Sequence, residues 1–354
     1  MSLLELSMSH LADNCRTQAE LVDALETNAP LNVRLAAALR QTDRALFLPS
    51  SGPGEGAKLS AGGQYAEPYA NRPQQLGFGA TLSTPHHHAG AMAPLAEWID
   101  AAHSSGAART TVRALDLGCG TGYLTVLMAN LLHGASDALR LERIEVAGID
   151  SIPTLINSAR ECAALASPHS VADAVGGEGA AALEGVGAAV RLEYASSAER
   201  DWQQWGADEP CYDWIHVGFA LPPHLAESLA RRLAPGGRLV APVTFEGEDA
   251  AQNLSVYDRT ASETGREELE VSILTRTVCQ PMIEAGDAAA QCEKADAASG
   301  AEQISAVQAE LTEWRDAFQI REGRIATRDD LMADDVAKEL FESFALLRRC
   351  VGKA

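Results

Sequence analysis

The feature that most constrains the fold of this chain is a glycine-rich turn, Asp116-Leu-Gly118-Cys119-Gly120-Thr-Gly122. An apolar run that predicts a strand, 112–117, leads into the turn, and a run that predicts a helix, 122–132, follows it. Glycine at every second position lets the backbone turn sharply and lets a ligand approach the main chain. This order of strand, turn and helix is typical of the ligand-binding edge of an α/β sheet. The motif alone leaves open a plain tight turn or a dinucleotide site.

The sequence after residue 110 alternates between strand-like and helix-like patterns, which indicates an α/β fold. A mostly parallel, twisted sheet with helices on both faces is the expected architecture. Strands are predicted at 112–117, 144–149, 190–194, 213–217 and 237–243, followed by a terminal hairpin at 253–258 and 269–279. Helices are predicted between them at 122–132, 153–166 and 222–233.

The segments before this core have a different character. Apolar residues recur every three or four positions in 11–48, which predicts helices there with a break near 28–30. A further helix is predicted at 89–102. Segments without a regular pattern are expected to be a flexible loop (50–64), an irregular stretch (65–90) and a surface insertion in the core (167–189). The apolar stripe of the first helices consists of Leu21, Val22, Leu25, Val33, Leu35, Leu39 and Leu46.

The C-terminal region predicts a linker, 284–301, and then two amphipathic helices, the second preceded by the capping signal Thr327-x-x-Asp330. Two such helices cannot bury their apolar stripes alone, so they are expected to dock on the core, on each other or on a partner. The stripes are Ile304, Val307, Leu311, Trp314 and Phe318, and then Val336, Leu340, Phe341, Phe344 and Leu347. The expected division of the chain is an N-terminal helical and lid segment (1–110), an α/β core (111–283) and a linker with a helical extension (284–354).

Composition narrows the classes of partner. The net charge of −21 argues against nucleic acid, because an acidic surface repels phosphate. No apolar run approaches the ~20 residues that a membrane helix needs, and the first residues lack the pattern of a secretory signal. The seven cysteines are scattered without a CxxC pair, which favours free thiols in a reducing compartment. We therefore expect a cytoplasmic protein that binds neither nucleic acid nor membrane.

A second acid, Asp150, ends the strand that follows the glycine-rich turn. A carboxylate there can accept hydrogen bonds from both ribose hydroxyls of a nucleoside, and it follows the turn at the expected distance of roughly 20–30 residues. Asp116, just before the first glycine, suits a ligand with a cationic amine better than a pyrophosphate. Together the two acids favour a nucleoside that bears an amino-acid tail, which describes S-adenosylmethionine.

A distinctive segment before the turn ends in Thr81-Leu-Ser83-Thr-Pro85-His86-His87-His88. It begins Tyr65-x-x-x-Tyr69-x-x-x-Pro73, and it closely resembles the signature of the protein-L-isoaspartate O-methyltransferases. The resemblance covers about residues 20–283 and implies the Rossmann-like fold of class I methyltransferases. Further matching segments are Thr42-Asp-Arg-Ala-Leu-Phe-Leu-Pro49, Ile215-His-Val-Gly-Phe-Ala220 and Leu233-Ala-Pro-Gly-Gly-Arg-Leu-Val-Ala-Pro-Val243.

This resemblance implies methyl transfer from S-adenosyl-L-methionine to the free α-carboxylate of isoaspartyl residues, with D-aspartyl residues as a further expected substrate and S-adenosyl-L-homocysteine as product. A carboxylate is ionised near neutral pH, so no general base is required. The task is to align the carboxylate oxygen, methyl carbon and sulfur and to exclude water. Ser83 occupies the position of the family's serine, whose hydroxyl orients the carboxylate. The alternative is a loop serine that caps the helix predicted near 89.

Other residues follow from the resemblance or weigh against other chemistry. Where the family has Gly-Asp-Gly after the third strand, this chain has Ala195-Ser196-Ser197, so adenine recognition is expected to be weaker or to pass to the backbone. No metal is expected, because adjacent histidines in a loop rarely converge on one ion, and His216 is expected to be a satisfied core residue. The expected cofactor-binding residues are Pro85, His86, Asp116, Gly118, Cys119, Gly120, Gly122, Asp150, Ser151, Ser196 and Ser197.

Two other functions remain open on the sequence alone. One is a class I methyltransferase that acts on another carboxylate or a small molecule, against which the complete Thr81-x-Ser83-x-Pro85-His86 signature argues. The other is a non-catalytic, cofactor-binding adaptor, against which the complete glycine-rich turn and its two acids argue. Isoaspartyl peptides and proteins are the expected partners of a monomeric enzyme, with the helical tail as a candidate interaction element.

Overall fold

The chain divides into two compact units, of which the first consists of Met1–Leu48, Glu67–Gln74 and Thr81–Ala288 and the second of Pro49–Ala66, Gln75–Ala80 and Ala289–Ala354. The computed structural model describes residues 15–48, 67–77, 80–106, 109–166, 187–194, 212–244, 252–261, 267–277, 279 and part of the stretch 311–337. The predicted loop at 50–64 and linker at 284–301 lie outside these residues, as does most of the insertion expected at 167–189.

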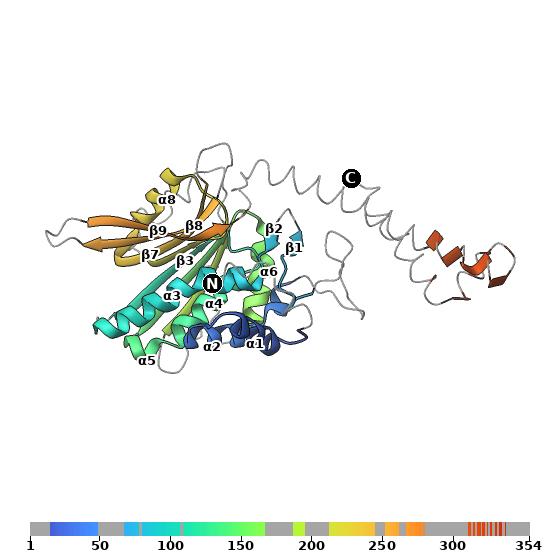
Figure 1. The fold of residues 1–354 in the computed structure, drawn as a ribbon, viewed down its shortest axis with the longest axis horizontal. Coiled ribbons are helices and arrows are strands. Elements are labelled where there is room, and N and C mark those ends of the chain that lie inside the picture. Colours follow the sequence, from blue (N-terminus) through green and yellow to red (C-terminus); the bar gives the residue numbers. More distant parts are fainter. Residues whose placement is uncertain are drawn as a thin grey trace. The chain divides into compact units, whose positions relative to one another are not determined.

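The first unit is built on a seven-stranded sheet with the strand order β5-β4-β3-β6-β7-β8-β9 (Figure 1). The pairs from β5 to β7 are parallel, and β8 and β9 add an antiparallel hairpin at one edge. The predicted parallel sheet with a terminal hairpin is therefore confirmed. The strands are β3 (Thr111–Leu117), β4 (Arg143–Asp150), β5 (Gly187–Tyr194), β6 (Tyr212–Val217), β7 (Leu233–Thr244), β8 (Gln252–Ala261) and β9 (Glu267–Thr277).

Helices cover both faces of this sheet, as expected for an α/β fold. Side chains alternate across a strand, and Leu115 and Leu117 of β3 share one buried cluster with Leu229 of α8. The opposite face of β3 carries Asp116, which is hydrogen-bonded to Thr125 of α4. The helices are α1 (Gln18–Asn28), α2 (Val33–Gln41), the 3-10 helix η2 (Arg44–Phe47), α3 (Pro85–Ser105), α4 (Tyr123–His133), α5 (Ser136–Leu139), α6 (Pro153–Ala166) and α8 (Pro223–Ala230).

Three features differ from the sequence prediction. The helix expected at 89–102 begins four residues earlier, at Pro85, because Thr84 is its N-cap and proline is favoured in the first turn. The stretch expected to be irregular also contains β1 (Gln74–Gly77) and β2 (Ala80–Leu82), which form a separate two-stranded sheet. Val33, assigned to the apolar stripe, is 80% exposed, because it is the first residue of α2 and that helix buries the face of Leu35 and Leu39 instead.

The N-terminal helix α2 packs on α4 and α1 packs on α2, and this packing fixes the position of η2, which follows α2. Gln18 of α1 donates from Nε2 to the Leu39 carbonyl at 2.7 Å, which ties α1 to α2. Asn130 of α4 donates from Nδ2 to the Thr42 hydroxyl at 2.9 Å. Because Thr42 ends α2 and η2 follows at once, these bonds hold η2 against α4, and the ring of Phe47 in η2 contacts the ring of Tyr123 at the start of α4, with centroids 5.4 Å apart.

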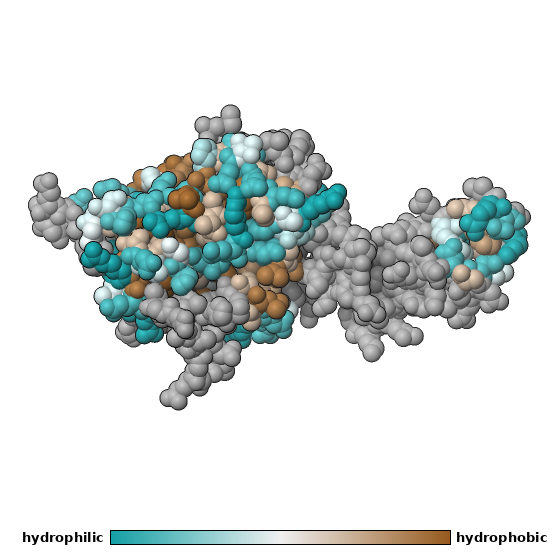
Figure 2. Space-filling view, turned by 90° about the horizontal axis from the view of Figure 1, so that it is seen from below, coloured by the Kyte–Doolittle hydropathy of each residue, from teal (hydrophilic) through white to brown (hydrophobic). Residues whose placement is uncertain are grey.

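Polar side chains cover most of one face of the described surface (Figure 2). Figure 2 shows one face, on which hydrophilic residues predominate and hydrophobic residues form separate patches. No helix in the described part of the chain is long and apolar enough to cross a membrane.

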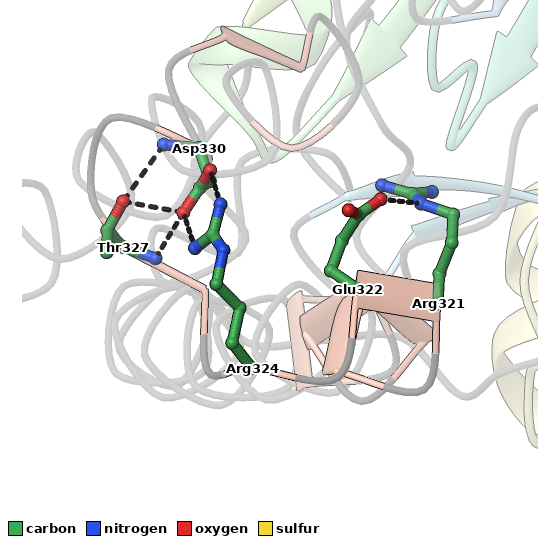
Figure 3. A network of polar contacts seen from close by, with 5 residues as sticks. All are labelled: Arg321, Glu322, Arg324, Thr327 and Asp330. Atoms are coloured by element: carbon green, nitrogen blue, oxygen red, sulfur yellow. Dashed lines mark hydrogen bonds and ion pairs between the residues drawn. The ribbon is translucent and has the colours of Figure 1, made fainter.

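The C-terminal stretch contains the predicted capping signal. The Asp330 backbone N–H donates to the Thr327 hydroxyl at 3.3 Å, and the Thr327 backbone N–H donates to the Asp330 carboxylate at 2.8 Å (Figure 3). Arg324 binds both oxygens of the same carboxylate at 2.6 Å, which with Thr327 holds the pKa of Asp330 well below its usual value. Of the first predicted stripe, the rings of Trp314 and Phe318 contact each other at a tilt of 37°, with centroids 5.4 Å apart. The second stripe lies outside the described residues.

Candidate functional site

The glycine-rich turn joins β3 to α4, and its amides bond to the protein itself. Gly118 and Cys119 both donate to the Ile149 carbonyl, at 2.8 and 3.0 Å, and Gly122 donates to the Cys119 carbonyl at 2.8 Å. Gly120 donates to the Asp150 carboxylate at 2.9 Å. These four N–H groups are therefore not available to cradle a pyrophosphate, which argues against the dinucleotide site that the motif alone left open.

Close packing against the loop after β6 explains two of the glycines in this region. Gly118 has a φ of +76°, and a Cβ on it would lie 2.7 Å from the Phe219 ring. A Cβ on Gly218 would lie 2.6 Å from the Gly118 carbonyl oxygen, and the Gly218 N–H donates to the Leu117 carbonyl at 2.7 Å. The strand order reverses between β3 and β6, so these loops meet at the switch point where open α/β sheets bind ligands.

Asp116 is buried and uses both carboxylate oxygens inside the protein. Its Oδ1 accepts from Nδ1 of His216 at 2.8 Å, and its Oδ2 accepts from the Thr125 hydroxyl at 2.7 Å. Asp116 and His216 lie directly opposite each other in the parallel register of β3 and β6. The expectation that His216 is a satisfied core residue is confirmed, and its partner is the acid that opens the turn. Asp116 thus ties β3, β6 and α4 together beneath the glycine-rich loop.

Asp150 ends β4, and its carboxylate spans the base of the loop. One oxygen accepts from Gly120 and the other from the Ile152 N–H, each at 2.9 Å. Burial raises the pKa of Asp150 above its usual value, while these two bonds act in the opposite direction. The side chain stays partly exposed, as does Ser151 next to it. Because each oxygen has a second lone pair, the carboxylate can still accept hydrogen bonds from a ligand.

The signature segment runs from β2 into α3, with Ser83 partly exposed between them. The helix is capped by Thr84, whose hydroxyl accepts from the His87 N–H at 3.3 Å, so capping does not account for Ser83. Pro85 and His86 are buried in the first turn. Asn71 Oδ1 accepts from the His86 backbone N–H at 3.2 Å and from its ring Nδ1 at 2.8 Å. The first turn of α3 is therefore fastened to the preceding loop.

The three consecutive histidines each lose basicity through burial. Desolvation lowers the pKa of His86, lowers the pKa of His88 well below its usual value, and with nearby histidines lowers the pKa of His87 to about 4. Within the described residues, no cluster of histidine, cysteine and acidic side chains is arranged to hold a metal ion. The three side chains are accordingly neutral parts of the structure near pH 7.

Arg44 in η2 was not predicted from the sequence as a site residue, although its segment carried part of the family resemblance. Its side chain is completely buried, and its Nη2 donates to the Ser83 carbonyl at 2.6 Å. Three residues later in the same helix, the Phe47 carbonyl accepts from the Thr121 hydroxyl at 2.7 Å. The segment Arg44–Phe47 thus joins the Ser83 loop to the glycine-rich loop within the first unit.

Cys119 is buried, and burial raises the pKa of its thiol well above the usual value, so it stays protonated. Ser196 and Ser197 lie outside the described residues, so their role remains a prediction.

The comparisons with known proteins agree with this geometry. The family model for protein-L-isoaspartate(D-aspartate) O-methyltransferase matches residues 16–278. The chain belongs to this family. Among its relatives, the protein-L-isoaspartate O-methyltransferase of Triticum aestivum is 29% identical over 64% of this chain and 76% of its own length. The relative from Caenorhabditis elegans is 29% identical over 64% of this chain and 78% of its own length.

A solved structure shows the same fold. It is a Plasmodium falciparum protein described as a protein-L-isoaspartate O-methyltransferase, in complex with S-adenosyl-L-homocysteine. It has a TM-score of 0.52 and 20% identity, and the match covers 76% of this chain and 100% of that chain. The predicted class I methyltransferase fold is thereby confirmed. The glycine-rich loop and the serine of the signature segment, Ser83, both lie within the residues that the family model matches.

Proposed function

We propose that this protein transfers the methyl group of S-adenosyl-L-methionine to the free α-carboxylate of isoaspartyl residues in proteins. The observation that carries the proposal is the link through η2, because Arg44 holds the Ser83 carbonyl and Phe47 holds Thr121 of the glycine-rich loop. A methyl transferase needs this coupling, since the acceptor oxygen and the donor must be aligned. Family membership over residues 16–278 supports the same reaction.

The residues at the switch point fit this cofactor. The loop glycines bring bare backbone to the ligand, and Asp150 keeps acceptor capacity for ribose hydroxyls. When bound, S-adenosyl-L-methionine supplies an electrophilic methyl group on a sulfonium, whose carbon–sulfur bond breaks as the carbon–oxygen bond forms. We assign Asp116 to holding the loop in place, because both of its oxygens are used within the protein. The other residues predicted from the sequence are proposed to bind the cofactor: Pro85, His86, Gly118, Cys119, Gly120, Gly122, Asp150, Ser151, Ser196 and Ser197.

Ser83 is the residue that we propose as catalytic. The substrate carboxylate is already ionised near neutral pH, so the chain need not remove a proton. The neutral hydroxyl donates a hydrogen bond to one carboxylate oxygen and turns the other toward the methyl carbon. His86 and His88 do not compete for this role, because burial lowers their pKa values and bonds to Asn71 and Arg44 occupy their Nδ1 atoms.

The test is methyl transfer from labelled cofactor to an isoaspartyl peptide and to its normal aspartyl twin. We expect labelling of the isoaspartyl peptide alone. Ser83→Ala should lower kcat by roughly 100-fold, since misplaced reactants lose rate on that scale, with cofactor affinity nearly unchanged. Ser104→Ala, which alters an exposed serine of α3, is the matched control and should leave both unchanged. Cofactor binding without labelling of either peptide would refute the proposed substrate, whereas loss of binding in Ser83→Ala would refute the assignment of Ser83.

We further propose that the enzyme is a cytoplasmic monomer whose C-terminal region is an accessory interaction element. The thiols of Cys119, Cys162 and Cys279, which form no disulfides, support a reducing compartment. Light scattering of the purified protein tests whether it is a monomer. Fractionation of cells that express it tests the cytoplasmic location.

A further inference from the structure

Arg44 is unusual because its charge is completely buried. The side chain is 0% exposed, and among the described residues no carboxylate lies within ion-pair distance of it. Its neighbours are neutral: the Ser83 carbonyl at 2.6 Å, the Leu82 carbonyl at 3.4 Å, Nδ1 of His88 at 3.0 Å and the Tyr123 ring. Its buried Nε has no hydrogen-bond partner among the described residues. Buried charges are normally paired, because desolvation is costly, so this arginine calls for an explanation.

The side-chain hydrogen bonds of Arg44 reach the turn that carries Ser83 and the start of α3. A guanidinium is planar and rigid, so two of its nitrogens fix the direction of whatever they bind. Nη2 donates to the carbonyls of Leu82 and Ser83, and Nη1 donates to Nδ1 of His88 at the start of α3. Because arginine only donates, Nδ1 of His88 must accept, and His88 therefore carries its proton on Nε2. The backbone of Ser83 thus takes its orientation from Arg44.

No carboxylate of the described residues compensates the charge of Arg44, which lies beside the serine where we propose that the substrate binds. Burial lowers the pKa of Arg44 to about 10, so the side chain is still cationic near pH 7. In a desolvated setting a charge acts over a longer range than it does in water. An anion next to Ser83 would experience this positive potential, and a neutral group of the same shape would not.

We propose that Arg44 is a positioning and specificity residue, which orients Ser83 through its hydrogen bonds and favours an anionic carboxylate at Ser83 through its buried charge. This inference rests on the proposed function and adds the residue that selects the ionised acceptor. Arg44 acts through Ser83 and through its field, so it is not a catalytic residue.

The experiment compares two peptides in three proteins. The first peptide is the isoaspartyl substrate, and the second is its α-carboxamide twin, a neutral non-substrate whose Ki is measured by competition. The proteins are the wild type, Arg44→Gln, which loses the charge, and Arg44→Lys, which keeps the charge but loses the planar fork. Rates are normalised to the number of S-adenosyl-L-homocysteine sites titrated, so that unfolded protein does not count. Arg40→Gln is the matched control, because Arg40 of α2 is a partly exposed arginine in surface ion pairs.

We expect the wild type to prefer the carboxylate peptide and Arg44→Gln to lose about tenfold of that preference, since a screened charge several ångströms away is worth roughly that factor. Both variants should lose kcat by about 10- to 100-fold, because Ser83 is no longer aligned. Arg44→Lys should keep the wild-type preference, because lysine keeps the positive charge. If the role of Arg44 were purely structural, Arg44→Lys and Arg44→Gln would show the same preference.

Three results would overturn the inference. One is an unchanged preference and kcat in Arg44→Gln, and another is an equal loss of preference in both variants. The third is a parallel loss of S-adenosyl-L-homocysteine affinity, which would make Arg44 a support of the cofactor loop. A wild type that methylates no isoaspartyl peptide would instead overturn the proposed function, and this inference with it. If Arg44→Gln fails to fold, a wild-type kcat in Arg44→Lys overturns the positioning role.

Discussion

His87 lies in the first turn of α3, where burial lowers its pKa to about 4, and burial also lowers the pKa of His86 and His88. In the unfolded chain these histidines titrate near their ordinary pKa of about 6.5. Between these values the unfolded state binds protons that the folded state does not, so the free energy of unfolding falls as the pH falls. We expect full stability from the histidines above pH 6.5 and a progressive loss from pH 6.5 toward pH 4.

The measurement is urea unfolding of the wild type and His87→Asn at pH 7 and pH 5. The difference between the two proteins isolates His87 from carboxylates such as Asp150, whose raised pKa acts with the opposite sign. The wild type should lose on the order of 1 kcal/mol more per pH unit than the variant. His133→Asn, which changes an exposed histidine, should parallel the wild type. Parallel curves for His87→Asn as well would show that His87 protonates freely in the folded protein.

Asp150→Asn tests the base of the cofactor site. The amide keeps one acceptor oxygen for either Gly120 or Ile152 but loses the charge and the second acceptor. Hydrogen bonds to a charged group contribute about 1.5–3 kcal/mol, so the Kd for S-adenosyl-L-homocysteine should rise by at least about tenfold. Isothermal titration measures this, with the exposed Asp137→Asn as control. An unchanged Kd would remove Asp150 from the proposed site.

At the scale of the element, the turn between β3 and α4 can be separated into backbone strain and packing. Gly118 and Gly106 have similar φ values of +76° and +66°, but a Cβ would clash only at Gly118, where Phe219 lies 2.7 Å away. Alanine in a left-handed conformation costs roughly 1–2 kcal/mol at both positions, and overpacking adds about 1–3 kcal/mol at Gly118. Denaturant unfolding should therefore show a larger loss for Gly118→Ala than for Gly106→Ala. Equal losses would mean that Phe219 moves aside without cost.

The same scale shows which parts of the fold the sequence could predict. The strand–helix alternation predicted the core because β3, α4, β4 and α6 carry strong local periodicity, and α6 has the predicted bounds, 153–166. The start of α3 was missed although Thr84 and Pro85 form a regular N-terminal signal, since three histidines gave no apolar period. The Asp116–His216 pair depends on the register of two strands a hundred residues apart in the chain. The local sequence pattern of each strand does not determine the register between the two strands.

Arg44 marks a further limit of this kind at the candidate site. The glycine-rich turn and Ser83 were identified because they belong to recognisable motifs, whereas arginine is ordinarily a surface residue. Its burial follows only from the packing of η2 between α1 and the start of α4, and from the position of the Ser83 carbonyl. Arg44 therefore becomes part of the link between the Ser83 loop and the glycine-rich loop only in the folded protein, which local sequence does not show.

For the molecule as a whole, the family match ends at residue 278, one residue after the last strand. Gln252 closes this end by donating from Nε2 to the Cys279 carbonyl at 3.0 Å and accepting the Cys279 N–H at 2.5 Å. The first unit extends to Ala288. In the part of the chain that the structure describes, the last strand of the sheet and the bonds that close its end therefore precede the C-terminal stretch, which supports the proposed division of the chain near residue 284.

Deleting residues 289–354 tests that division, because the truncated chain keeps β9, Cys279 and every described residue of the proposed site. We expect a cooperative unfolding transition within a few degrees of the full-length Tm, and an unchanged Kd for S-adenosyl-L-homocysteine. Isoaspartyl methylation should also persist, since Ser83, Arg44 and the glycine-rich loop all lie in the first unit. A matched truncation at residue 266 removes β9, so that β8 keeps only its pairing with β7 and becomes an exposed edge strand; this product should have a clearly lower Tm and should aggregate. An unfolded product from the first deletion would make the C-terminal region part of the core.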